Sequence, residues 1–112
     1  ALDLPDWLVP LLRESLGASL APVAEALRSR APVFLRVNLA RTGRAAAVAA
    51  LAAEGITAVP HPLAETALEV TGNARKVQAS QAYAAGLAEL QDAASQAVAE
   101  ALPLADGMRV LD

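Results

Sequence analysis

The stretch FLRVNLARTGR, residues 34–44, gathers the side chains best suited to ligand chemistry in this 112-residue chain. It places Arg36, Asn38, Arg41 and Arg44 at the end of a predicted strand and in the turn into a predicted helix. Guanidinium groups and the N–H groups at a helix start both bind phosphate. The stretch therefore predicts a phosphate-contacting patch. The alternative is a set of solvated surface residues.

Other residues add little chemistry. Arg75 and Lys76 form a second basic pair, and His61 stands alone between two prolines, which indicates a structural or surface residue. The sequence contains no cysteine, which excludes a thiolate metal site and a cysteine nucleophile. No Ser-His-Asp set or glycine-rich phosphate loop can be assembled. We therefore expect no catalytic residue and no metal site in this chain.

Composition restricts the class of protein further. The net charge is −3, so any contact with nucleic acid must come from a local patch. Hydrophobic residues make up 55% of the chain and aromatic residues 3%, which favours alanine-rich and leucine-rich helices. No apolar run approaches the length of about 20 residues that spans a bilayer, and no basic segment opens the chain as in a signal peptide. We expect a cytoplasmic protein without membrane contact.

Two helices are predicted before residue 31. Apolar residues recur at helical spacing in LPDWLVPLLRESLG and in ASLAPVAEALRSR. Asp6 or one of the residues just before it is the expected N-cap of the first helix, and Gly17 is its expected end. Leu20 and Leu27 are expected to point inward from the second. Trp7 is expected to pack against other side chains, because RNA-stacking surfaces present several aromatics together.

The central part of the chain alternates between strand and helix patterns. Period-two patterns predict strands in APVFLRVNLA, ITAVPHP, ALEVTG and LAELQ. Helical spacing predicts helices in RTGRAAAVAALAAEG, with Thr42 as N-cap, and over about residues 77–84. The order strand, helix, strand, strand is that of a small ferredoxin-like or RNA-recognition-like layer. The predicted fold class is therefore α+β.

The last segment combines a helix with a strand. DAASQAVAEAL predicts a helix in which Asp92 is the N-cap, Gln96 returns a capping bond, and Val98 and Leu102 are buried. MRVLD at the C-terminus predicts a strand. A lone strand with apolar faces is prone to pair with another chain. We therefore expect fraying, or a homodimer formed through this helix and strand.

Four segments together resemble a known family: LPDWLVPLLRESLG, APVFLRVNLARTGR, GLAELQDAASQAVAEAL and GMRVLD. In this order they are similar to the Sun (Fmu) branch of the NOL1/NOP2/Sun RNA cytosine-5 methyltransferases, along nearly the whole chain. The resemblance implies linker helices over residues 1–30 and a small α/β RNA-binding subdomain over 31–91. It further implies the first helix and strand of a Rossmann-like methyltransferase domain over 92–112, often with a NusB-like helical domain before the linker.

The same resemblance implies that RNA binding and catalysis lie in different parts of the parent protein. In the family, one cysteine adds to C6 of cytosine so that C5 can take the methyl group of S-adenosylmethionine, and a second helps to release the enzyme. Both lie downstream of the segment matched here, so the chain is expected to bind no cofactor and to guide ribosomal RNA for its longer parent. The RNA contacts that the resemblance implies are Arg36, Asn38, Arg41, Arg44 and Lys76, with Asn38 orienting the turn or touching RNA. The alternative is a non-catalytic protein-interaction module.

Overall fold

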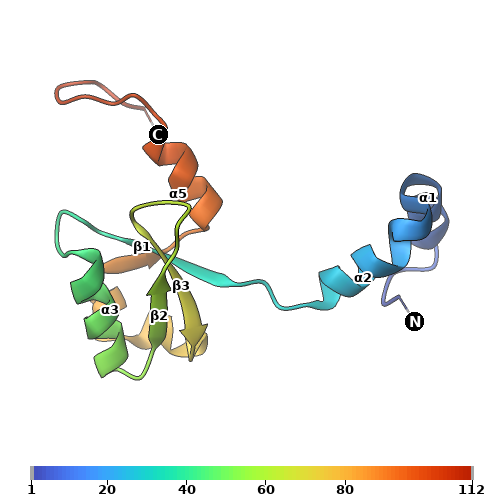
Figure 1. Cartoon of the computed structure of the whole chain (residues 1–112), viewed down its shortest axis with the longest axis horizontal. Helices are drawn as coiled ribbons and strands as arrows, with labels where there is room; N and C mark the ends of the chain where they lie inside the picture. The colour runs from blue at the N-terminus through green and yellow to red at the C-terminus, as the bar shows by residue number, and fades with distance from the viewer. Residues whose placement is uncertain (1, 112) are drawn as a thin grey trace. The chain divides into compact units, whose positions relative to one another are not determined.

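The computed structural model describes residues 2–111. The chain forms two compact units, residues 1–31 and residues 32–112, which are coloured from blue to red along the chain in Figure 1. None of the helices formed by residues 2–111 is both long and apolar enough to cross a membrane.

The first unit is a pair of short helices. They are α1 (Leu8–Leu16) and α2 (Leu20–Arg28), joined by the 3-10 turn η1 (Gly17–Ser19). Gly17 ends α1 with a φ of 53°, and its N–H bonds back to the Arg13 carbonyl. This left-handed conformation is cheap for glycine, so the predicted helix end is confirmed. Arg28, in the last turn of α2, forms an ion pair with Asp3 at 3.0 Å.

Three predictions for this unit were wrong. The N-cap of α1 is Trp7, not Asp6, and within residues 2–111 no side chain caps the helix. Trp7 is 70% exposed and does not pack as predicted; Leu27 is also exposed. Leu20 and Ala24 are buried. Two nine-residue helices cover only the centre of their shared apolar stripe, so apolar residues at its ends stay in water.

The second unit is built on a four-stranded antiparallel sheet. Its strands are β1 (Val33–Val37), β2 (Thr57–Pro60), β3 (Ala67–Gly72) and β4 (Ala88–Leu90), in the order β2-β3-β1-β4. Helix α3 (Arg44–Ala53) links β1 to β2, while η2 (Ala74–Ala79) and α4 (Gln81–Ala84) link β3 to β4. Each crossover skips one strand, which is the ferredoxin-like arrangement. The α+β prediction is confirmed.

The main core lies on one face of this sheet. Successive side chains of a strand point to opposite faces, so Leu35 and Val37 of β1 face α3 and contribute to the same cluster as Leu51, Ile56 and Leu68. These five side chains are almost completely buried. Partly buried residues complete the cluster; they include Val48 and Tyr83.

Helix α5 (Ala93–Glu100) covers part of the opposite face. Its Ala93 joins a small cluster with Ala64 and Ala67, against which Phe34 packs. The Asp92 carboxylate accepts a hydrogen bond from the Ala94 N–H at 2.9 Å, so the predicted N-cap is confirmed. The small side chains let the helix approach the sheet closely, and α5 packs against β1 and β3.

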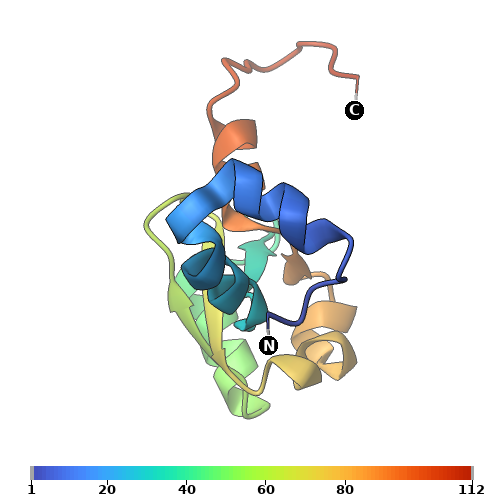
Figure 2. The same cartoon turned by 90° about the vertical axis from the view of Figure 1, so that its right-hand side faces the viewer.

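The outer side of α5 departs from the prediction. Val98 and Leu102 are 69% and 53% exposed rather than buried, because Val98 lies on the side of α5 away from the sheet and Leu102 lies beyond the end of the helix at Glu100. Residues 108–111, predicted as a strand, form none. A strand needs a hydrogen-bonded neighbour, and within residues 2–111 this segment pairs with none of the four strands. Figure 2 shows it running away from the sheet beyond α5.

Candidate nucleic-acid interface

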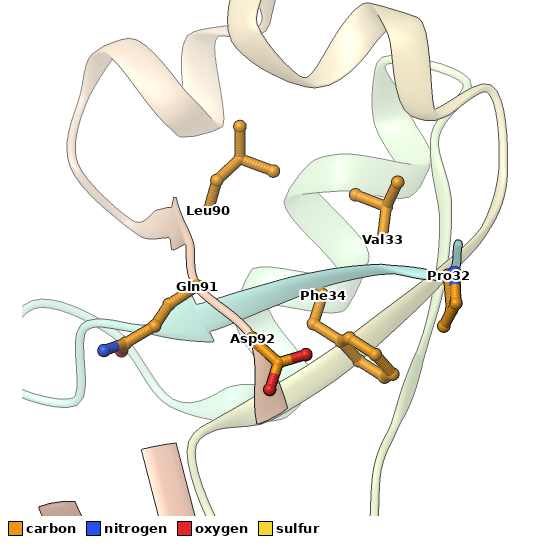
Figure 3. A pocket seen from close by; sticks show the side chains of 6 residues that line it. All are labelled: Pro32, Val33, Phe34, Leu90, Gln91 and Asp92. Atoms are coloured by element: carbon orange, nitrogen blue, oxygen red, sulfur yellow. The ribbon is translucent and has the colours of Figure 1, made fainter. Parts of the chain in front are cut away.

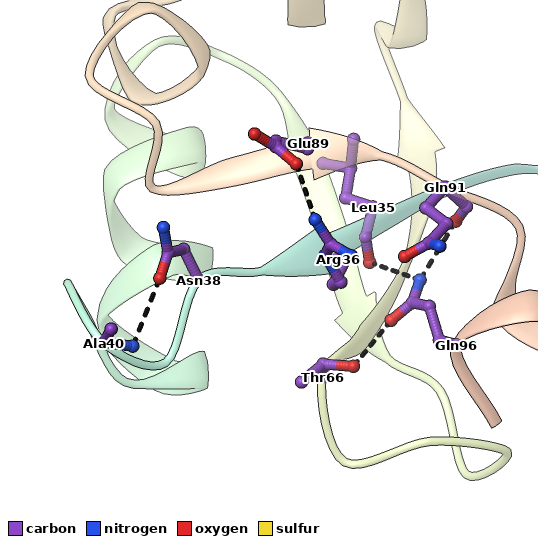
Figure 4. Close-up of polar contacts among 8 residues, drawn as sticks. All are labelled: Leu35, Arg36, Asn38, Ala40, Thr66, Glu89, Gln91 and Gln96. Atoms are coloured by element: carbon purple, nitrogen blue, oxygen red, sulfur yellow. Dashed lines mark hydrogen bonds and ion pairs between the residues drawn. The ribbon is translucent and has the colours of Figure 1, made fainter. Parts of the chain in front are cut away.

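The turn from β1 into α3 is held by Asn38. Its side-chain oxygen accepts a hydrogen bond from the Ala40 N–H at 3.2 Å (Figure 4). Its main-chain carbonyl accepts from the N–H groups of Arg41 at 2.9 Å and Thr42 at 3.0 Å. This is the local bonding by which asparagine favours turns. Of its two predicted roles, the structure shows Asn38 orienting the turn.

Arg36 is the next-to-last residue of β1 and lies on the face of the sheet that α5 partly covers. It stands directly opposite Glu89 of β4 in the sheet register, and its Nη2 donates to the Glu89 carboxylate at 2.7 Å. Both side chains are about half exposed. An exposed pair of this kind contributes little to stability, but it partly neutralises the guanidinium of Arg36.

Arg41 reaches across the end of the sheet. Its Nη1 donates to the Ala85 carbonyl at 2.8 Å, and its guanidinium lies over Gly86. Gly86 has a φ of 66°, and a Cβ there would stand 3.5 Å from Nη1 of Arg41. Arg41 therefore fastens the β1–α3 turn to the turn that precedes β4.

Arg44 is the first residue of α3. The N-cap is Gly43, in extended conformation, so the prediction of Thr42 as N-cap was wrong; the Thr42 hydroxyl instead donates to the Gly43 carbonyl at 3.4 Å. No side chain of residues 2–111 caps this helix, which leaves its first N–H groups to solvent. The charge of Arg44 acts on the carboxylate of Glu100 in α5.

Lys76 lies near the other end of α3. It lines a shallow cavity with Glu54, Ile56, Ala79 and Ser80, and its Nζ is 3.5 Å from the point where a Cβ on Gly55 would stand. Helix α3 spans ten residues, or about 15 Å. The predicted cations are therefore gathered at two places, the β1–α3 turn and η2, rather than in one cluster.

A glutamine in α5 was missed as a key polar residue. Gln96 is 1% exposed, and its amide N–H₂ donates to the carbonyls of Leu35 at 3.2 Å and Gln91 at 3.0 Å (Figure 4). Its Oε1 accepts from the Thr66 hydroxyl at 2.8 Å. The side chain thus joins β1, the β2–β3 loop and α5, and does not return a capping bond to Asp92. The sequence signal that could have predicted its role is a long polar residue among small residues on the side of α5 that faces the sheet.

A shallow cavity marks the point where β4 ends and β1 continues. It is lined by Pro32, Val33, Phe34, Leu90, Gln91 and Asp92 (Figure 3). Phe34 meets the ring of His61 edge-on, with 5.1 Å between ring centroids, so His61 has a structural contact. The buried Oε1 of Gln91 has no hydrogen-bond partner among residues 2–111.

This fold and these residues agree with one protein family. Residues 4–78 match the family described as "Methyltr_RsmF/B-like, ferredoxin-like domain". The chain belongs to this family. The matched range covers both helices of the first unit and the sheet as far as η2, and the match confirms the predicted resemblance.

Relatives along nearly the whole chain agree. The chain is 38% identical over 108 residues to the ribosomal RNA small subunit methyltransferase B of Xanthomonas campestris, covering 96% of this chain and 24% of the relative. It is 37% identical to the protein of the same name from Vibrio cholerae, again covering 96% of this chain and 25% of the relative. The chain therefore spans about a quarter of the length of these relatives.

A solved structure agrees with the fold. The crystal structure of a protein designated PH0851 superposes with a TM-score of 0.62 at 22% identity, covering 78% of this chain and 20% of that one. At this identity the likeness concerns the fold alone.

Proposed function

We propose that this chain is the RNA-binding N-terminal part of a ribosomal RNA cytosine-C5 methyltransferase that uses S-adenosylmethionine, and that it positions the RNA for a catalytic domain outside these residues. The observation that carries the proposal is the alignment of 96% of the chain with about a quarter of relatives named ribosomal RNA methyltransferases. Bacterial small-subunit RNA is processed in the cytoplasm, and we infer that location for the parent protein.

The five predicted RNA contacts differ in what engages their side chains. Arg36 and Arg41 are engaged by Glu89 and by the Ala85 carbonyl, and Asn38 shapes the turn. Within residues 2–111 no hydrogen bond or ion pair engages the side chains of Arg44 and Lys76. We therefore expect Arg44 at the start of α3, and Lys76 with Arg75 on η2, to make the main phosphate contacts. The affinity of such a protein for RNA falls as the salt concentration rises, because each phosphate contact releases counterions.

The described residues do not fit S-adenosylmethionine. Residues 107–111 form no strand, so within the described residues they present no strand end against which the cofactor could be held. S-adenosylmethionine supplies the methyl group in the parent, and no step of that transfer is assigned to the residues of this chain. Residues 92–112 remain the proposed start of the methyltransferase domain, whose core would cover the exposed apolar side of α5.

Binding of RNA tests this proposal. We expect the variant Arg44→Gln/Arg75→Gln/Lys76→Gln to bind a single-stranded RNA oligonucleotide more weakly in fluorescence anisotropy. The slope of log K against log salt should fall by about 2, because each phosphate contact on a single strand contributes about 0.7. The matched control is Arg13→Gln/Arg30→Gln/Arg109→Gln, which removes the same charge from exposed positions outside the patch. Equal losses in the two variants would contradict the assigned patch.

The second candidate is a protein-interaction module without RNA contact. It is favoured by the exposed apolar residues of the C-terminal segment, which are Val98, Leu102, Leu104, Met108, Val110 and Leu111. Exposed apolar patches mark protein interfaces. If the chain binds no RNA even at low salt, this reading replaces the first.

A further inference from the structure

The end of α5 is tied to the β2–β3 loop by one carboxylate. Oε2 of Glu100 accepts a hydrogen bond from the Glu65 N–H at 3.1 Å, and Oε1 accepts from the Thr66 N–H at 3.2 Å. The Thr66 hydroxyl also lies 3.1 Å from Oε1. Two consecutive main-chain N–H groups that point at one anion form a nest, an arrangement that binds phosphates in other proteins.

The surroundings of this nest favour negative charge. The hydrogen bond from the Glu65 N–H lowers the pKa of Glu100 the most; burial opposes it, and the Thr66 bonds and the charge of Arg44 lower it further. We also expect Arg44 to contact an RNA phosphate, as we expect of Arg75 and Lys76 on η2. The nest and this guanidinium therefore act on the same anion from two different elements, the β2–β3 loop and α3.

The carboxylate that fills the nest can be withdrawn with little disturbance. Glu100 is exposed and is the last residue of α5, where helices open most readily. One turn earlier, Gln96 stays anchored to β1 and to Gln91. A hydroxyl has one hydrogen, so Thr66 donates to Glu100 or to Gln96 at any moment. When Glu100 leaves, the Thr66 hydroxyl therefore keeps a partner.

We propose that the Glu65–Thr66 nest, together with Arg44, is a phosphate site that the Glu100 carboxylate occupies and that a phosphate of the RNA backbone takes over by displacing it. The inference rests on the proposed function. A phosphodiester carries one negative charge, as the carboxylate does, so the exchange preserves the charge in the nest. Its oxygens can accept both main-chain bonds, and the positive charge of Arg44 favours a phosphate as it favours the carboxylate. RNA binding would thereby release the end of α5.

A phosphate titration of Glu100→Ala tests the site. In ¹H–¹⁵N NMR spectra, inorganic phosphate should shift the amide signals of Glu65 and Thr66 in this variant and saturate. In the unchanged chain the apparent affinity for phosphate should be lower by about tenfold or more, because the site is open for only a fraction of the time. Asp106→Ala removes the same charge from an exposed position and should behave as the unchanged chain. Adding Arg44→Gln to Glu100→Ala should abolish the saturation.

RNA then separates this inference from the proposed function. An oligonucleotide should shift the same two amides in the unchanged chain, and Glu100→Ala should bind it several-fold more tightly. If RNA binds and shifts signals of η2 but leaves Glu65 and Thr66 unmoved, the exchange is overturned while the proposed function stands. If no RNA binds, both are overturned. Should Glu100→Ala lose its fold, Glu100→Gln replaces it, and an unresponsive nest in that folded variant would also overturn the site.

Discussion

Gln96 shows how one side chain can hold three elements together. Its amide satisfies two main-chain carbonyls and its oxygen accepts from the Thr66 hydroxyl, all in a nearly water-free position. Replacement by leucine would remove this partner from the two carbonyls, while the Thr66 hydroxyl would keep Glu100. Each buried group left unsatisfied costs about 1–3 kcal/mol.

We therefore expect Gln96→Leu to lower the free energy of unfolding by about 3 kcal/mol in total, measured by urea denaturation. The exposed Gln78 on η2 provides the control, since Gln78→Leu removes the same amide from the surface and should change stability by less than about 0.5 kcal/mol. Similar values for the two variants would show that the buried bonds contribute no more than a surface amide.

Glu100 should make the β2–β3 loop sensitive to acid. Its pKa is lowered in the folded chain, chiefly by the bond from the Glu65 N–H. A lowered pKa means that the contribution to stability is present above the ordinary glutamate pKa of about 4.3 and is lost as pH falls through the folded value.

The measurement is the pH dependence of the Glu65 and Thr66 amide shifts. In the unchanged chain their midpoint should lie below the ordinary value for glutamate, and in Glu100→Gln this transition should vanish. A transition that survives the substitution would have to come from another carboxylate, the side chain of Glu65 being the nearest in sequence.

At the scale of elements, Glu54 connects the end of α3 to the start of α4. Its carboxylate accepts hydrogen bonds from the N–H groups of Gln81 at 2.7 Å and Ala82 at 3.1 Å. Helix α4 has four residues, too few to be stable without such support. The carboxylate thus caps a helix that belongs to the other crossover of the fold.

We expect Glu54→Ala to lower the free energy of unfolding by about 1 kcal/mol, the usual cost of losing a side-chain cap. Hydrogen exchange should also become faster at Gln81 and Ala82, while amides in β1 stay protected. Glu69→Ala, which removes a carboxylate from β3, is the control for charge. Unchanged exchange at α4 in Glu54→Ala would assign its order to the Ser80 cap instead, whose hydroxyl accepts from the Tyr83 N–H at 3.1 Å.

The elements most predictable from sequence were those in which periodicity and burial agree. β1 was predictable because Val33, Leu35 and Val37 alternate with polar or half-buried residues, and one face is covered. Pairing order followed from the order of the elements. Helix caps were less predictable: Gly43 took the cap position expected for Thr42, because its extended backbone starts the helix without a side-chain bond.

The candidate site was predictable by residue type but not by geometry. The strand register that pairs Arg36 with Glu89 joins positions 53 residues apart, and spacing along the chain carries no information on such a pair. The same holds for the nest that receives Glu100, which depends on two main-chain N–H groups from a distant loop. Partners distant in sequence determine which arginine and lysine side chains remain available for a ligand. These pairings cannot be read from a single sequence.

At the scale of the whole molecule, the outer side of α5 is the feature that needs an explanation. Val98 and Leu102 are largely exposed, although each would contribute about 2 kcal/mol if fully buried. In the parent, the proposed methyltransferase domain would cover them. The 112-residue chain by itself offers them to a second copy, which is the homodimer predicted from the sequence.

We therefore expect the chain to self-associate in sedimentation velocity as its concentration rises. Val98→Gln/Leu102→Gln should weaken the association by at least about tenfold. Each buried apolar side chain contributes more than about 1.4 kcal/mol, which corresponds to a factor of ten in affinity. Leu63→Gln changes an equally exposed leucine in the β2–β3 loop and should leave the association unchanged. A monomer at every concentration would show that this side of α5 is complementary to another surface and not to itself. Its apolar residues would then be available to the proposed methyltransferase domain.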